Sequence, residues 1–132
     1  MVKDVKDIRC EIKIRLTDAS GTPFMGVGLV WLLERIDTLK SISKAAEDMS
    51  LSYPKALRML ADLEGALGQA AVLRHKGGSL RGGAELTAAG RILLEEFRSF
   101  RDRVQVQAEA LFEGEYRDRI FTRLLPPGDQ AR

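Results

Sequence analysis

The apolar residues of this chain follow two different periods along the sequence. From Cys10 to Leu16 they alternate with charged residues, so that Ile12, Ile14 and Leu16 share one side. This period of two predicts a half-buried, charged edge strand. From Gly26 onwards the spacing becomes helical and predicts a first core helix, whose buried positions are Leu29, Leu32, Leu33, Ile36 and Leu39.

Two short helical segments follow, and a tight break separates them. Ser41 or Ser43 is placed to cap the first segment, which runs to about Met49. Ser52 is placed to cap the second, which covers about 53–67. Two short helices with a tight turn between them predict a helix-turn-helix. The second helix carries one apolar face, formed by Ala56, Leu60, Leu63 and Leu67.

A hairpin and a long helix complete the pattern. Residues 71–73 and 84–86 are typical of two short strands, and the glycine-rich stretch 76–83 between them predicts a hairpin tip. Thr87 is placed to cap a last helix over about 88–112. Because its apolar stripe recurs at steps of four and three, this helix is expected to pack against a partner helix; the stripe is Leu93, Phe97, Phe100, Val104, Gln107 and Leu111.

Composition indicates the size of the folded domain and the cellular compartment that we expect. The chain has 132 residues, 45% of them hydrophobic and 30% charged, which is enough for one compact folded domain, expected over 10–113. The proline-containing tail 125–132 is expected to be disordered. No apolar stretch approaches ~20 residues and the N-terminus is charged, so we expect a cytoplasmic protein without a membrane partner. The single cysteine, Cys10, cannot form an internal disulfide.

The charge of the chain is informative only when it is counted separately for different segments. The net charge of +2 does not by itself indicate a nucleic-acid-binding protein. Residues 38–91, however, carry eight lysines and arginines against five acids, whereas residues 92–119 carry five arginines against seven acids. The helix-turn-helix and hairpin therefore favour phosphate contact, and the last helix does not.

The order of helix, helix-turn-helix and hairpin predicts a mainly α winged helix-turn-helix fold with a small β component, an N-terminal strand and a long C-terminal dimerisation helix. In this arrangement the second helix, about 52–65, enters the major groove. The glycine-rich wing, 76–84, then contacts the backbone or the minor groove. We therefore expect a sequence-specific regulator of transcription that binds double-stranded DNA as a homodimer, with no cofactor and no metal.

Arg58 is the best candidate for reading a base, because its planar fork can contact guanine O6 and N7 together, while Lys55 suits a phosphate. Arg58 could instead be an ordinary solvated residue, and Tyr53 could bind a phosphate or pack under the helix start. Four glycines would let the wing approach DNA closely, although a flexible loop with incidental charge is the alternative. The predicted DNA-binding residues are Ser43, Lys44, Ser52, Tyr53, Pro54, Lys55, Arg58, Lys76 and Arg81, and the predicted dimerisation residues are Leu93, Phe97, Phe100, Val104 and Leu111.

Other function classes find less support in these residues. The only histidine, His75, precedes the wing and Cys10 is remote in sequence, so no nucleophile and base can be paired and we expect no enzyme. A winged-helix protein-interaction module that does not bind DNA is the stronger alternative, because the net charge is low. The cations at 55, 58, 76 and 81 argue against it.

Several motifs resemble those of a known family. They are Ser41-Ile42-Ser43-Lys44-Ala45-Ala46, Leu51-Ser52-Tyr53-Pro54-Lys55-Ala56-Leu57, Gly77-Gly78, Gly82-Gly83-Ala84 and Leu86-Thr87-Ala88-Ala89-Gly90. Through them the chain resembles the N-terminal DNA-binding domain of ModE-type molybdate-responsive regulators over roughly 12–112. Through Ser52, Arg58, Leu63-Glu64 and Leu67-Gly68 its helix-turn-helix is also similar to that of LysR-type regulators.

The resemblance implies a dimeric winged-helix DNA-binding protein, with the helix after Thr87 in the dimer and residues 52–58 on DNA. It implies no molybdate site, because no oxyanion-binding domain follows in this sequence. The chain could be a stand-alone regulator that senses something else or nothing, or it could act with a separate anion-binding protein.

Overall fold

The computed structural model describes residues 7–75, 83–125 and 128. The chain divides into two compact units, which are described separately. The winged-helix unit is Lys13–Ser99. The strap-and-helix unit combines Met1–Ile12 with Phe100–Arg132. Across the described ranges, no helix is long and apolar enough to span a membrane.

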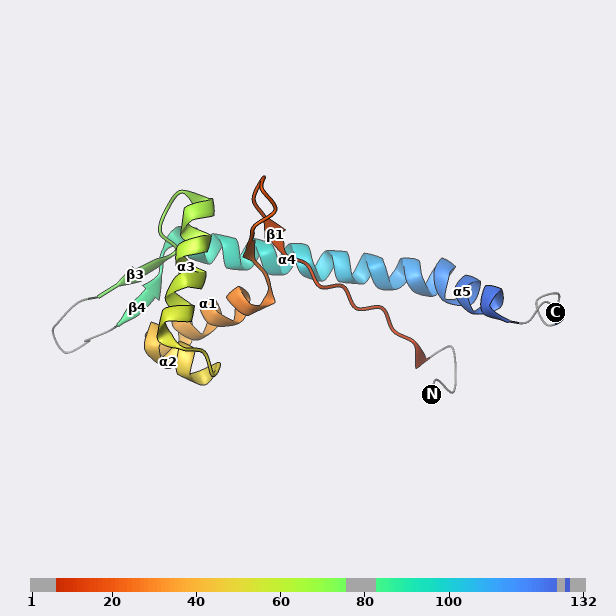
Figure 1. Cartoon of the computed structure of the whole chain (residues 1–132), viewed down its shortest axis with the longest axis horizontal. Helices are drawn as coiled ribbons and strands as arrows, with labels where there is room; N and C mark the ends of the chain where they lie inside the picture. Colours follow the sequence, from red (N-terminus) through yellow and green to blue (C-terminus); the bar gives the residue numbers. More distant parts are fainter. Residues whose placement is uncertain (1–6, 76–82, 126–127, 129–132) are drawn as a thin grey trace. The chain divides into compact units, whose positions relative to one another are not determined.

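The winged-helix unit contains three helices, two small antiparallel hairpins and the start of a fourth helix (Figure 1). The predicted first helix and helix-turn-helix are confirmed, as is the long last helix. Their apolar faces meet in one core that includes Leu32, Leu33, Ile36, Leu63 and Phe97. The elements are β1 Leu16–Thr17, β2 Pro23–Met25, α1 Val27–Leu39, α2 Ile42–Asp48, α3 Tyr53–Leu67, β3 Val72–Arg74, β4 Ala84–Leu86 and α4 Ala88–Leu111.

Hydroxyl caps define where three of these helices begin. The Ser41 hydroxyl accepts a hydrogen bond from the backbone N–H of Lys44 at 3.1 Å, and Ser52 accepts one from Lys55 at 3.2 Å. Thr87 accepts one from the N–H of Gly90 at 3.1 Å. Each cap satisfies a backbone donor that the first helical turn leaves without a partner. Of the two serines considered for α2, Ser41 is the cap.

The hairpin after α3 forms as predicted, but its first strand lies one residue later than expected. Val72 pairs with Leu86 and Arg74 with Ala84. Ala71 lies outside the strand because its N–H donates to the Glu64 carboxylate at 2.7 Å. Gly83 also bridges to Ser41, so the base of the wing is attached directly to the start of α2.

The predicted strand over 10–16 is wrong except at its end. Only Leu16 is in β1, where it pairs with Met25. Residues 8–12 form an extended segment, the N-terminal strap. The expected alternation over 10–16 is present except at Ile12: Cys10, Ile14 and Leu16 are half-buried, whereas Ile12 is exposed. Among the described residues no strand pairs with the strap, whose backbone bonds to side chains instead. The Gln105 amide oxygen accepts from the N–H of Ile12 at 2.8 Å, and its amide nitrogen donates to the Cys10 carbonyl at 2.7 Å.

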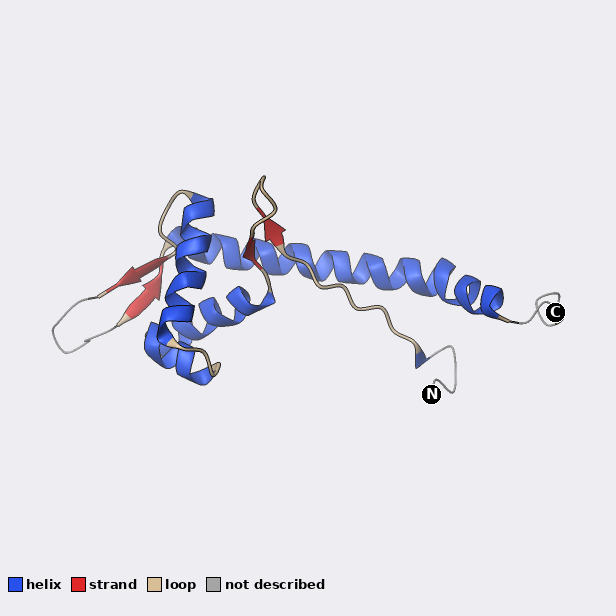
Figure 2. Ribbon diagram, in the orientation of Figure 1, coloured by secondary structure: helices blue, strands red, loops and turns tan. Residues whose placement is uncertain are grey.

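The last helix continues beyond the predicted end near Phe112. In the strap-and-helix unit, α4 passes into a π-helical turn, η3 Phe112–Tyr116, and then into α5 Arg117–Leu124. The N–H of Arg117 donates to the Phe112 carbonyl, five residues back, so the helical ribbon is not interrupted (Figure 2). Most of the tail predicted to be disordered, 125–132, lies outside the described residues.

Candidate nucleic-acid interface

The two helices of the helix-turn-helix pack through small residues. Ala45 and Ala46 of α2 and Ala56 of α3 are almost completely buried, and such short side chains let two helices approach closely. The turn between them contains Ser50 with φ of 55°, and the N–H of Leu51 donates to the Ala46 carbonyl at 2.9 Å. This tight turn determines which face of α3 points away from α2.

α3 has a buried face and an exposed face. Ala56, Leu60 and Leu63 are buried in the core, and Leu57 and Met59 pack against its edge. Leu57 is partly buried although its neighbour Arg58 is exposed. The N-terminal half of the exposed face therefore carries mainly polar and charged side chains, together with Pro54, which the first helical turn tolerates.

The structure brings most of the predicted DNA-binding residues to the N-terminal ends of α2 and α3. All of the described ones are exposed, including Tyr53 at 43%. Lys76 and Arg81 lie outside the described residues. The exposed residues are Ser43, Lys44, Ser52, Tyr53, Pro54, Lys55 and Arg58.

Several arginines of the same unit are paired with acidic side chains, whereas the cations of these two helix ends are not. Within the described ranges, Lys44, Lys55 and Arg58 form no ion pair. The three pairs that other arginines form are Arg35 with Asp48 at 2.6 Å, Arg91 with Asp37 at 3.2 Å and Arg98 with Glu34 at 2.7 Å. Acidic side chains therefore leave the positive charge of α2 and of the first turns of α3 available to a phosphate backbone.

Arg74 is a cation at the interface that the sequence analysis did not select. It is the last residue of β3, it is exposed, and among the described residues it forms no ion pair. Arg74 therefore lies at the base of the wing. Its neighbour His75 lies 3.5 Å from the Glu85 carboxylate, across the hairpin. A strand predicted over 72–74 would have included Arg74, but the strand predicted from the sequence, 71–73, begins one residue too early.

A compact joint holds α3, the wing and α4 together. The Glu64 carboxylate of α3 accepts from the N–H of Ala71, while the Ala71 carbonyl accepts from the N–H of Thr87 at 2.9 Å. Gly90 lies against the same carbonyl group, where a Cβ atom would approach the Ala71 carbonyl carbon to 3.0 Å. Because each contact connects a different element, the joint determines how the wing lies relative to α3.

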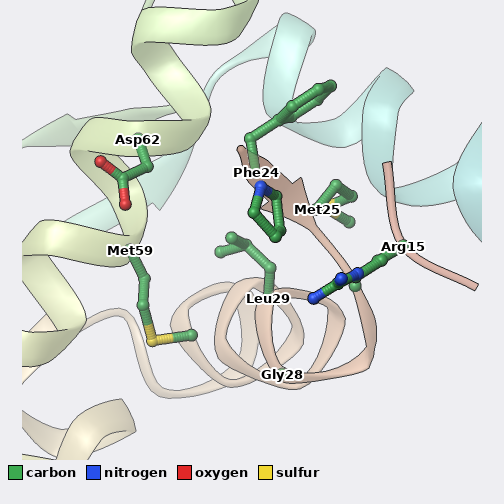
Figure 3. A pocket seen from close by; sticks show the side chains of 9 residues that line it. Arg15, Phe24, Met25, Gly28, Leu29, Met59 and Asp62 are labelled. Atoms are coloured by element: carbon green, nitrogen blue, oxygen red, sulfur yellow. The ribbon is translucent and has the colours of Figure 1, made fainter. Parts of the chain in front are cut away.

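An apolar hollow of about 220 Å³ lies among β2, α1 and α3 (Figure 3). Met59 of α3 reaches across towards Gly28 of α1, and Arg15 and Asp62 stand at its edges. A Cβ atom at Gly28 would lie 3.7 Å from the Met59 methyl group, which is an ordinary contact. The packing of α3 on α1 is therefore looser here than in the surrounding core.

The predicted dimerisation residues fall into two groups. Phe97 is buried in the core of the winged-helix unit and Leu93 packs against it, together with Leu94, which the stripe did not include. Phe100 and Leu111 are 49% and 53% exposed, and Val104 is half-buried. Of the predicted dimerisation residues, those from Phe100 onwards are therefore the ones accessible to a partner.

Comparison with known proteins agrees with this geometry. Residues 30–91 match the model of the bacterial regulatory helix-turn-helix proteins of the lysR family. Among solved structures, the chain is similar to CbnR, a LysR family transcriptional regulator, at 26% identity and a TM-score of 0.49. That similarity covers 65% of this chain and only 29% of the length of CbnR. A search of curated proteins finds no significant match. The segment that holds α2, the exposed cations and the joint at Gly90 is thus the part of the chain that is similar to the lysR-type helix-turn-helix.

Proposed function

We propose that this protein binds double-stranded DNA with sequence specificity and regulates transcription. The observation that carries the proposal is the set of exposed, unpaired cations at the start of α3, on a helix pair that matches the lysR-type helix-turn-helix. The N-terminal turns of α3 enter the major groove, and the wing approaches the backbone or the minor groove.

The residues of α3 have different roles in this proposal. Arg58 lies one turn into the helix, and its two-pronged guanidinium fits the O6 and N7 acceptors of guanine. Lys55 and Lys44 bind phosphates, and Arg74 directs charge from the base of the wing to the adjacent backbone. Tyr53, which is exposed at the first position of α3, donates its hydroxyl to a phosphate.

The proposed active form is a homodimer, because a dimer presents two copies of α3 to two half-sites of an inverted repeat. The exposed apolar residues from Phe100 onwards support it. The glycine pairs of the wing and the Leu86-Thr87 motif support a closer relation to ModE-type domains.

The test uses the full chain and a duplex selected from a random pool, with binding followed by fluorescence anisotropy. Arg58→Ala should reduce the preference for the selected site over a scrambled one by about 1–3 kcal/mol, roughly 5-fold to 150-fold. Lys55→Ala should weaken binding to both duplexes equally and lower the salt dependence.

Lys13→Ala provides the matched control. It removes one positive charge from an exposed residue that lies outside both the matched segment and the proposed dimer surface, so it should leave affinity and preference unchanged. The proposal fails if affinity is insensitive to salt and Arg58→Ala behaves like Lys13→Ala. That result would instead favour a protein-interaction module.

A further inference from the structure

The apolar hollow of the winged-helix unit has space that the packing of the helices does not require. Its walls include the side chains of Phe24, Leu29 and Met59. Gly28, in the first turn of α1, contributes no side chain, although a Cβ atom there would make only an ordinary contact of 3.7 Å with the Met59 methyl group. Alanine would therefore fit at this position and would be the better helix former. Glycine at position 28 keeps the hollow open.

The size and the lining of the hollow suit one small apolar group. Its volume is about 220 Å³. An apolar cavity of about 150 Å³ accommodates benzene, whereas sites for drug-sized ligands begin at roughly 300 Å³. Aromatic rings pack favourably against other rings and against thioether sulfur, and Phe24 and Met59 supply one of each. The hollow therefore fits a single ring that carries one small polar group.

Arg15 provides a cation at one edge of the hollow. Its guanidinium extends towards Leu29 (Figure 3), and among the described residues it forms no ion pair. The acid three residues along, Asp18, is bound instead within its own turn, by the Ser20 hydroxyl at 2.6 Å and the Thr22 N–H at 3.0 Å. A guanidinium binds a carboxylate through two parallel hydrogen bonds. The polar group that this edge fits best is thus a carboxylate.

The rest of the hollow limits the ligand to one negative charge. At the Arg15 edge, Gly26 gives α1 no side-chain cap, so the N–H groups of the first turn also favour an anion there. At the opposite edge stands Asp62 of α3, which forms no ion pair within the described ranges. A second anionic group would lie either near this carboxylate or against apolar carbon, and both positions are unfavourable.

We propose that the apolar hollow binds a small aromatic monocarboxylate and that this ligand regulates DNA binding. Met59 directly follows Arg58 in α3, and it reaches across the hollow towards Gly28. A ring in the hollow displaces the Met59 side chain and changes how this turn of α3 packs on α1. DNA affinity should fall, because the turn carries Arg58. Ligand binding is independent of the proposed function, whereas its effect on DNA rests on it.

The first experiment titrates benzoate into the full chain by calorimetry and follows the methionine methyl groups by NMR. Benzoate should saturate the protein, and the Met25 and Met59 methyl signals should shift while that of Met49, which does not line the hollow, should not. Acetate lacks the ring, benzamide lacks the charge and terephthalate carries a second charge, so each should bind at least tenfold more weakly than benzoate.

Arg15→Gln should raise the benzoate Kd at least tenfold, because it removes the cation and leaves the apolar walls intact. Lys13→Gln is the matched control. It removes an exposed cation two residues away that does not line the hollow, and it should change the Kd less than twofold. Benzoate that fails to saturate the protein, or that binds Arg15→Gln as tightly as the wild type, overturns the proposed site.

The second experiment measures the effect on DNA by fluorescence anisotropy with the selected duplex. Acetate at the same concentration replaces benzoate in the reference sample, because added salt alone weakens DNA binding. Saturating benzoate should raise the DNA Kd at least threefold in the wild type and leave it unchanged in Arg15→Gln. Saturating duplex should weaken benzoate binding by the same factor, since coupling is reciprocal. Benzoate that binds without any effect on DNA affinity refutes the regulation alone. Benzoate that binds a chain with no affinity for duplex DNA refutes the proposed function and leaves the ligand site standing.

Discussion

Gly90→Ala is expected to destabilise the winged-helix unit even though it places alanine, the best helix former, inside a helix. Gly90 lies in the first turn of α4, and its Cα faces the Ala71 carbonyl. An added Cβ atom would lie 3.0 Å from the carbonyl carbon and closer still to the oxygen. The obstacle is backbone, which cannot rotate away as a side chain can. Either α4 or the start of β3 must therefore move.

The size of the effect follows from three contributions. Overpacking of a tight contact costs about 1–3 kcal/mol. Displacing the Ala71 carbonyl also weakens the hydrogen bond that it accepts from the N–H of Thr87, worth about 1 kcal/mol. Replacing glycine by alanine in a helix returns about 1 kcal/mol. The free energy of unfolding should therefore fall by about 1–3 kcal/mol, which lowers the Tm by roughly 4–12 °C.

Urea unfolding followed by circular dichroism measures this change, at one fixed protein concentration because dimerisation would also contribute to stability. Gly65→Ala is the matched control. Gly65 lies in α3 with no atom within 4 Å of a Cβ position, so the same substitution should stabilise the protein by about 0.5–1 kcal/mol. If Gly90→Ala stabilises the protein as much as Gly65→Ala does, the close approach of α4 to Ala71 is not as described.

Two further predictions concern α1 and the first hairpin. Gly28→Ala should raise the free energy of unfolding by about 0.5–1 kcal/mol in the same assay, because the new Cβ atom meets the Met59 methyl group at an ordinary 3.7 Å; a loss of stability would contradict the hollow of Figure 3. The Ser20 hydroxyl and the Thr22 N–H both donate hydrogen bonds to the Asp18 carboxylate. These bonds, the one from Ser20 more than the one from Thr22, lower the pKa of Asp18 below its usual value. The ionised Asp18 carboxylate should stabilise the turn fully above the usual carboxyl pKa, and this stabilisation should be lost as the pH falls through the lowered pKa of Asp18. An NMR titration of the Asp18 carboxyl and the Ser20 amide would detect the change.

Features encoded by neighbouring residues were predictable from the sequence. The capping roles of Ser52 and Thr87 follow from a hydroxyl placed three residues before the N–H that it satisfies, and the structure contains both bonds. The buried face of α3 follows from the period of Ala56, Leu60 and Leu63. Together these local signals defined the helix-turn-helix and the exposed position of Arg58.

Features that depend on distant residues were not predictable in this way. The alternation around Cys10 is real, but an alternating segment looks the same whether it pairs with a strand or lies along a helix. The deciding partner, Gln105, is 95 residues away from Cys10. The π turn is also invisible to a search for steps of three and four, because a step of five appears simply as the end of the pattern. For that reason the helix was expected to stop at Phe112.

The charge of the interface shows how the two kinds of information combine. Counting residues over 38–91 gives a small positive excess, but counting treats every arginine as equally available. Folding changes that, because Asp37 binds Arg91 from 54 positions away and Asp48 binds Arg35 from 13 positions away. Such pairs lower the field of the cations that they include, while Lys55 and Arg58 keep theirs. The charge available to DNA is therefore set by which cations the fold leaves unpaired, and the modest net charge of the chain is no argument against binding.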